Sequence, residues 1–289
     1  MEELLLSLIS GISNGAVYGL IGLGLVIIYR STDVMNFAIG SLALAAMYLA
    51  SSIHNGGAPL AIAILAAIAA CSLSGVAARE VLIRPLGPGA LFSALVVTMG
   101  LSLIVDDLTR EAWGGEPRTF PALVEGTATI AGATFENQQL LVIPVAAIAM
   151  LLVAYLFKRT PLGAAMRAVA ESSGTATLLG IKSQRVARVA WALGMALAAL
   201  GAAMLAPSTG LTIGAFAAVL FRAFAGIFLG GLTSMYGAVA GGVIVGVLDN
   251  LAATYVSASL RDTFVFSLVI LVLLVRPQGL FGEKSFARV

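Results

Sequence analysis

Two oppositely charged residues, Arg222 and Asp249, lie inside otherwise apolar stretches of this 289-residue sequence. A charge within an apolar span is unfavourable, so it usually pairs with another charge or faces a polar path through the protein. The two residues could therefore form an ion pair, or one of them could contact a polar solute. Asn36 presents a similar choice, because an unpaired amide in such a span is costly. It either bonds to neighbouring groups or faces the path.

The sequence is poor in side chains that catalyse reactions or bind metals. His54 is the only histidine, and Asn-Gly-Gly follows it in a short polar stretch that favours a turn. His-dependent triads and histidine metal sites need histidines deep in the protein, and a single histidine in a turn does not provide them. Cys71 is the only cysteine, which excludes an internal disulfide. The chain has no P-loop sequence for ATP. We expect no catalytic residue, no metal site and no cofactor.

The composition predicts that these residues belong to a membrane protein. The chain is 60% hydrophobic and 10% charged, with a mean hydropathy of +1.04, whereas soluble domains are about 25% charged. Nine apolar runs occupy residues 4–29, 34–53, 58–78, 91–105, 140–157, 189–206, 213–232, 238–256 and 264–275. A spanning helix needs roughly 20 such residues. We predict an all-α polytopic membrane protein, one permease-like domain over residues 1–289, with roughly eight to nine transmembrane helices.

The basic residues outside these runs predict the orientation of the chain. If the connection after the third run is cytoplasmic, twelve of them fall on that side: Arg30, Arg79, Arg84, Lys158, Arg159, Arg167, Lys182, Arg185, Arg188, Arg276, Lys284 and Arg288. Only Arg110, Arg118 and Arg261 fall on the other side. Because cytoplasmic loops are enriched in Lys and Arg, we expect the N-terminus outside and the C-terminus in the cytoplasm.

Two connections are long enough to have a function of their own. The outer one, residues 106–139, carries six acidic residues. The inner one, residues 158–188, carries six basic residues and Glu171 as its only acid. Thr160 followed by Pro161 is a helix start signal, and Gly180 is typical of a helix end. This segment could be an amphipathic helix that adheres to lipid, or a docking surface for a separate motor subunit.

Five sequence motifs, in order along the chain, resemble those of LivH-type permeases of branched-chain amino-acid ABC importers. The inner segment reads Arg-Ala-Val-Ala-Glu over 167–171, then Ala176 and Gly180-Ile181, which is similar to the family's coupling segment. The other four are Asn-Gly-Ala-Val-Tyr-Gly-Leu at 14–20, Asn-Phe-Ala-Ile-Gly at 36–40, the Gly-rich stretch at 229–242, and Leu-Val-Arg-Pro-Gln-Gly-Leu-Phe-Gly at 274–282.

The resemblance implies a transport subunit of the bacterial inner membrane that performs no catalysis itself. Its expected partners are two ABC ATPase subunits, a second related permease, a substrate-binding protein and the lipid bilayer, and no nucleic acid. The residues expected to couple to the ATPase are Arg167, Ala170, Glu171, Ala176, Gly180 and Ile181. Those expected along the substrate path are Asn14, Asn36, Phe37, Gly40, Arg222 and Asp249.

Two other functions compete with the importer. The first is an independent secondary carrier or channel for small solutes, urea and amides included. Such a carrier usually needs a proton or ion relay, for which only Asp249 is available. The second is an intramembrane enzyme, for which the sequence offers no nucleophile–base pair. The solute itself is not determined by the sequence, although leucine, isoleucine and valine are the default for this family.

Overall fold

The computed structural model of the chain describes residues 2–87, 89–130 and 132–282. Most of these residues are helical. The helices are α1 (Glu2–Thr32), α2 (Ile39–Asn55), α3 (Leu60–Ala78), α4 (Leu91–Trp113), α5 (Asn137–Arg159), α6 (Pro161–Glu171), α7 (Ser173–Leu178), α8 (Ser183–Thr209), α9 (Ala215–Gly230), α10 (Met235–Tyr255) and α11 (Arg261–Val275). A π-helical turn (Arg79–Ile83) and a 3₁₀ turn (Arg84–Leu86) continue α3.

Each of the nine apolar runs corresponds to one helix. Within the described residues, six helices are long and apolar enough to cross a membrane: α1, α3 with its continuation to Leu86, α4, α5, α8 and α10. The other three, α2, α9 and α11, have 17, 16 and 15 residues, fewer than the roughly 20 that a full span needs. The polytopic helical fold is therefore confirmed, while the count of eight to nine spans stays a prediction.

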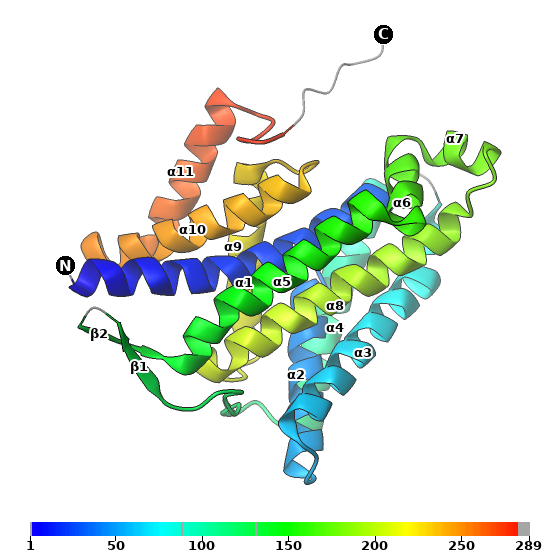
Figure 1. The fold of residues 1–289 in the computed structure, drawn as a ribbon. Helices are drawn as coiled ribbons and strands as arrows, with labels where there is room; N and C mark the ends of the chain where they lie inside the picture. Colours follow the sequence, from blue (N-terminus) through cyan, green and yellow to red (C-terminus); the bar gives the residue numbers. More distant parts are fainter. Residues whose placement is uncertain (1, 88, 131, 283–289) are drawn as a thin grey trace.

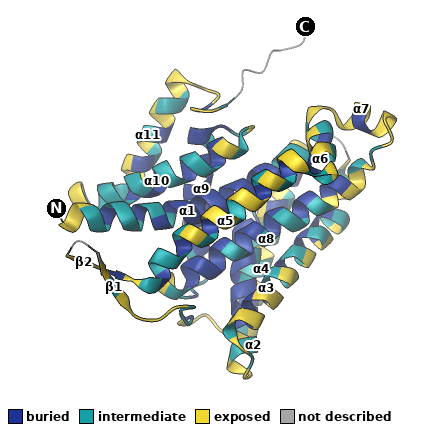
Figure 2. Ribbon diagram, in the orientation of Figure 1, coloured by how far each residue is buried: buried dark blue, intermediate teal, exposed yellow. Residues whose placement is uncertain are grey.

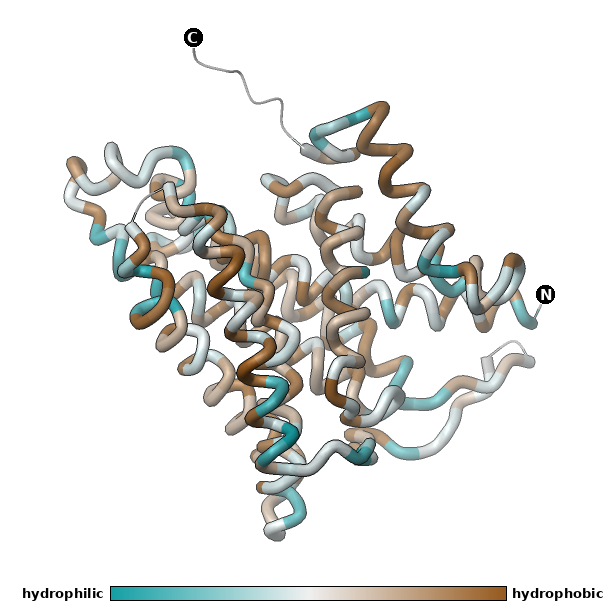
Figure 3. Tube along the Cα trace, turned by 180° about the vertical axis from the view of Figure 1, so that it is seen from behind, coloured by the Kyte–Doolittle hydropathy of each residue, from teal (hydrophilic) through white to brown (hydrophobic). Residues whose placement is uncertain are grey.

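Helix α1 lies in the middle of the bundle and contacts α5, α8, α9 and α10 (Figure 1). Residues 15–28 of α1 are all buried. By contrast, α4, α5 and α11 carry many exposed large apolar residues, and exposed positions recur along the ribbon of α5 in Figure 2. Hydrophobic residues follow the helices along their lengths, and hydrophilic residues gather near the helix ends and in the connections (Figure 3). This pattern fits a protein whose outer helices face lipid.

The bundle has two chemically different ends. The basic end carries α6 and α7 (Figure 1). Arg30, Lys158 and Arg167 line one cavity there. The hairpin end carries the N-terminus and the two strands described below (Figure 1). The sequence assigns the basic end to the cytoplasm. Lys284 and Arg288, which it places on the same side, lie outside the described residues.

The long connection at the hairpin end differs in part from the sequence-based prediction. Helix α4 continues through Asp106 and Asp107 to Trp113, so the connection begins later than residue 106. Strands β1 (Thr127–Ile130) and β2 (Ala133–Glu136) form an antiparallel hairpin, with Thr127 opposite Glu136. This short hairpin is a local addition to a fold that is otherwise helical among the described residues. The Thr-containing sequences around Gly132 (φ 88°) favour paired strands.

Glycines allow the central helices to approach one another closely. A Cβ atom at Gly15 would lie 2.7 Å from the Cα of Val243, and one at Gly246 would lie 2.3 Å from the Cα of Gly15. The contact between α9 and α10 is tighter, because a Cβ at Gly241 would lie 2.0 Å from the carbonyl oxygen of Gly226. The four-residue spacing of these glycines therefore serves close helix packing, as small residues do in membrane bundles.

We predict that Gly241→Ala lowers the amount of protein in the membrane several-fold. The added methyl group would overlap the backbone of Gly226. In an isolated helix, alanine is more favourable than glycine by about 1 kcal/mol. A decrease in membrane abundance would therefore come from the steric clash and not from helix propensity. Gly100→Ala in α4 is the matched control, since a Cβ there would meet no other described atom within 4 Å. Immunoblots of membrane fractions measure both. Equal abundance of the two variants would contradict this account of α9–α10 packing.

Candidate coupling segment and solute path

The coupling segment, residues 160–181, starts as the sequence predicts. The Thr160 hydroxyl accepts a hydrogen bond from the Gly163 N–H at 3.1 Å, and Pro161 occupies the first helical position. A Cβ at Gly163 would lie 2.2 Å from the carbonyl oxygen of Leu156. Only glycine therefore lets α6 turn back so closely against the end of α5. The start of the coupling segment is fixed directly to a membrane helix.

The segment consists of two helices, not one. At Ser172 the backbone is extended (φ −161°, ψ 106°), which ends α6, and the Ser172 hydroxyl caps α7 by accepting from the Thr175 N–H at 3.3 Å. At the other end, Gly180 has a positive φ of 84°. The Ile181 N–H donates to the Ala176 carbonyl and the Gly180 N–H to the Thr177 carbonyl, both at 3.0 Å. This Schellman-type end confirms Gly180 as a helix stop.

The predicted coupling residues differ in their exposure. Arg167, Glu171 and Gly180 are exposed, Ala170 and Ile181 are partly buried, and Ala176 is buried. Arg167 and Glu171 form no ion pair within the described residues, although they are four positions apart. Their charges are therefore available to another molecule. Whether these residues bind an ATPase stays a prediction.

Two leucines at the tip of the segment were not identified from the sequence. Leu178 is 89% exposed and Leu179 is 76% exposed. Leu178 is the last residue of α7 and Leu179 is its C-cap, so that an apolar pair projects from the basic end. Leucine side chains this exposed, next to exposed charges, suit a contact with a second protein. Their signal in the sequence was weak because leucine is common throughout this chain.

Hydrogen bonds and packing connect the coupling segment to the membrane helices. The hydroxyl groups of Thr177 and Ser183 are 2.8 Å apart, and the Ser183 hydroxyl also donates to the Ser173 carbonyl at 3.3 Å. Since Ser183 begins α8, these bonds join α7 to α8. Helix α6 also contacts α1, α5 and α8. A displacement of the coupling segment would therefore be transmitted to three long helices.

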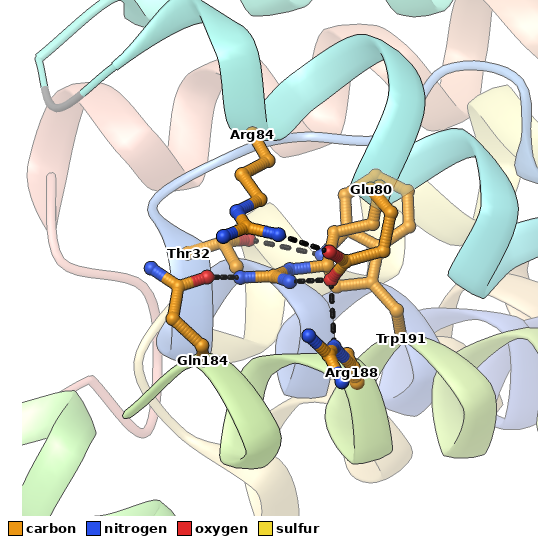
Figure 4. Close-up of polar contacts among 7 residues, drawn as sticks. Thr32, Glu80, Arg84, Gln184, Arg188 and Trp191 are labelled. Atoms are coloured by element: carbon orange, nitrogen blue, oxygen red, sulfur yellow. Dashed lines mark hydrogen bonds and ion pairs between the residues drawn. The ribbon is translucent and has the colours of Figure 1, made fainter. Parts of the chain in front are cut away.

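Close to this segment, Glu80 holds three arginines together (Figure 4). Its carboxylate accepts from Arg84 and Arg188, each at 2.9 Å, and also pairs with the buried Arg79. Arg79 donates in addition to the Gln184 side chain. The cluster joins the π-helical turn after α3 to the first turns of α8. Such π-helical turns occur frequently at functional sites.

The Glu80 cluster borders a cavity of about 520 Å³ at the basic end. Arg79 and Arg84 line one side of the cavity, Asp33 another, and Ser173 and Ser183 connect it to the coupling segment. One local pattern points to this cluster: a single acid, Glu80, lies four residues before Arg84 in a basic stretch. The contact with Arg188 is more than 100 positions away in sequence, so no local pattern could reveal it.

A second polar cavity, of about 410 Å³, lies at the hairpin end. It is lined by Asn14 from α1, Gln139 from α5, Thr209 from α8 and Glu136 of the hairpin, among others. Along α1, between the residues that line the two cavities, α1 meets α8 at Gly24 and Gly194. A Cβ at Gly24 would lie 2.5 Å from the Gly194 carbonyl oxygen. Of the predicted path residues, only Asn14 lines this cavity.

The motif at 36–40 packs inside the bundle. Asn36 is completely buried; its side-chain oxygen accepts from the Ala38 N–H at 3.0 Å, and its amide lies 3.5 Å from the Met195 sulfur. Phe37 packs on Phe224 with ring centroids 4.9 Å apart. Gly40 faces the backbone of α9 at Phe216. Asn36 is thus paired structurally in this conformation, and a role along the path stays a prediction.

Arg222 and Asp249 form the ion pair suggested by the sequence, at 3.2 Å, with both side chains buried. Two further charges complete a network that the sequence did not indicate. Arg222 also pairs with Asp262 at 2.5 Å, and Arg261 lies 3.8 Å from Asp249. Because Asp262 and Arg261 are partly exposed, the network extends from the buried pair to the surface. The six predicted path residues do not converge on one site.

The described side chains combine close helix packing, buried ion pairs and two polar cavities. Within residues 2–87, 89–130 and 132–282, no group of three or more His, Cys, Asp or Glu side chains could hold a metal ion. The buried charges Arg79, Arg222 and Asp249 are paired, and the polar cavities lie at opposite ends of a glycine-packed bundle. These features belong to a multi-pass membrane protein that moves a solute, and the chain belongs to the family described as the permease component of branched-chain amino acid transport systems, which it matches over residues 7–275.

Individual relatives are similar over nearly their whole length. The chain is 29% identical to the high-affinity branched-chain amino acid transport system permease protein LivH of Escherichia coli (strain K12), covering 97% of this chain and 96% of the relative. It is also 29% identical to the corresponding permease protein BraD of Pseudomonas aeruginosa, covering 98% and 97%. No match was found among solved structures. The family resemblance seen in the five motifs is confirmed.

Proposed function

We propose that this chain is a transmembrane subunit of an ATP-binding-cassette importer for branched-chain or related hydrophobic amino acids. The observation that carries this proposal is the coupling segment. It presents Glu171, Leu178 and Leu179 at the basic end of the bundle and is tied to α5 and α8. The family membership indicates the transport system, and the names of the relatives indicate the solute class.

The proposed mechanism is alternating access driven by separate subunits. A binding protein delivers the amino acid at the hairpin end, and two ATPases move the coupling segments at the basic end. This chain forms half of the path, and a second related permease forms the other half. The basic end then lies in the cytoplasm of the inner membrane, as the excess of Lys and Arg suggests. Movement of α6 and α7 reaches α5 and α8 through the contacts described above.

A secondary carrier is less well supported by the charge network. A carrier driven by protons or ions needs a titratable group that can bind and release its ion. Asp249 is the candidate, but Arg222 lies 3.2 Å from it and Arg261 lies 3.8 Å from it. Both arginines engage this carboxylate in ion pairs that join α9, α10 and α11. A carboxylate in this setting serves structure better than a proton relay.

We predict that the purified chain alone neither hydrolyses ATP nor accumulates leucine along a proton or sodium gradient. The sequence contains no P-loop, and the buried acid Asp249 is held by arginines. The measurements are phosphate release in detergent and labelled leucine uptake by proteoliposomes with imposed gradients. The positive control is liposomes that contain the chain together with the two ATPases, the second permease and the binding protein. Gradient-driven uptake by the chain alone would contradict the importer proposal and support the secondary carrier.

A further inference from the structure

A groove of about 470 Å³ opens on the side of the bundle near the basic end, where α5 and α10 both pack on α1. Its walls are apolar along the helices and include Leu23 of α1, Met150 of α5 and Val239 of α10. Toward the basic end the lining changes, and Arg30, Lys158 and Arg167 surround that part of the groove. The groove therefore combines a long apolar wall with a cationic end.

The three cations of this groove have no carboxylate partner among the described residues. This sets them apart from the other buried or clustered arginines, which Glu80, Asp249 and Asp262 neutralise. Among the residues that the structure describes, no acidic side chain lines the groove. Lys158 is held at its edge, with its ammonium 5.2 Å from the centre of the Tyr236 ring. Three neighbouring cations repel one another unless an anion lies between them.

The outer wall of the groove is continuous with a surface suited to lipid. Leu151 lines the groove and is 68% exposed, and Leu152 and Tyr155 beside it on α5 are also exposed. A helix of this length and apolarity crosses the membrane. Tyrosines and basic side chains near its end sit at the depth of the lipid head groups. An acyl chain can therefore enter the groove from the bilayer without crossing polar surface.

We propose that this groove binds one anionic glycerophospholipid of the leaflet at the basic end. The phosphate lies among Arg30, Lys158 and Arg167, and one acyl chain follows the apolar wall toward Leu23 and Val239. Basic pockets between membrane helices bind anionic head groups in this way. An inorganic phosphate would neutralise the cations but would leave the apolar wall unfilled. The bound lipid would also fix the start of α6 to α1 and α5, where the coupling segment begins.

The test uses the full chain purified in detergent and depleted of lipid. Phosphatidylglycerol, phosphatidylcholine or inorganic phosphate is added, and bound molecules are counted by native mass spectrometry. We expect one phosphatidylglycerol bound at least tenfold more tightly than phosphatidylcholine, since three cations line the end of the groove where the head group lies. Equal binding of both lipids, or equal occupation by inorganic phosphate, would overturn the proposal.

Two exposed basic residues adjacent in sequence provide a matched comparison. Lys158→Gln should reduce the preference for phosphatidylglycerol several-fold, and adding Arg30→Gln should abolish it. Arg159→Gln removes the same charge from an exposed position outside the groove lining and should leave the preference intact. Because Lys158 is exposed, its replacement tests binding without a risk to folding. Equal effects of Lys158→Gln and Arg159→Gln would contradict the proposed lipid site. Loss of the bound lipid when the chain assembles with a second permease would contradict it as well.

Discussion

Glu171→Lys is expected to abolish amino-acid uptake while the protein still inserts into the membrane. Glu171 is the last residue of α6, is exposed, and forms no ion pair among the residues that the structure describes. It is the only acid among six basic residues over 158–188. A partner that recognises it would present a cation, and a like-charge contact at an interface costs several kcal/mol. Uptake by vesicles and co-purification of the ATPase measure the effect.

Two further variants separate docking from a general effect of charge. Glu171→Asp keeps the carboxylate and should retain most of the uptake. Glu3→Lys makes the same charge change at an exposed position at the N-terminal end of α1, on the hairpin end of the bundle, and should transport normally. Normal uptake by Glu171→Lys, with the ATPase still bound, would mean that the ATPase contacts a different part of the coupling segment. In that case the exposed pair Leu178 and Leu179 becomes the next surface to replace.

The helices of this protein were predictable because membrane spans are continuous apolar runs. Each of the nine runs became a helix, but their ends were less predictable. Helix α4 extends past residue 105 because Asp106, Asp107 and Glu111 are compatible with a helix once it leaves the apolar region. The hairpin was missed because two strands of four residues each carry too little pattern to be distinguished from a loop.

The candidate sites show the same division between local and distant contacts. The start of α6 at Thr160 and the stop at Gly180 depend on residues within a few positions, so the sequence contains them. The three arginines around Glu80, and the addition of Asp262 to the Arg222 pair, require helices distant in sequence to meet. Sequence periodicity carries no information about such meetings. It identifies which charges need partners, and the fold decides which partners they have.

The charge network around Arg222 should respond unequally to its two single replacements. Arg222→Gln leaves Asp249 buried with only Arg261, 3.8 Å away, and it also removes the partner of Asp262. Asp249→Asn leaves Arg222 paired with Asp262 at 2.5 Å. Removing one member of a buried pair typically costs about 3–5 kcal/mol. We therefore expect Arg222→Gln to reduce membrane abundance strongly and Asp249→Asn to reduce it less.

The double variant Arg222→Gln with Asp249→Asn should restore abundance toward that of the unaltered protein, because no buried charge is left uncompensated and Asp262 is 56% exposed. Arg110→Gln is the control, since its pair with Asp107 is exposed on both sides and contributes little. Blots of one set of membranes give abundance, and labelled uptake gives function. If the double variant is abundant but inactive, Asp249 contributes to the solute path as well as to the fold. Full abundance of Arg222→Gln would show that the network does not hold α9, α10 and α11 together.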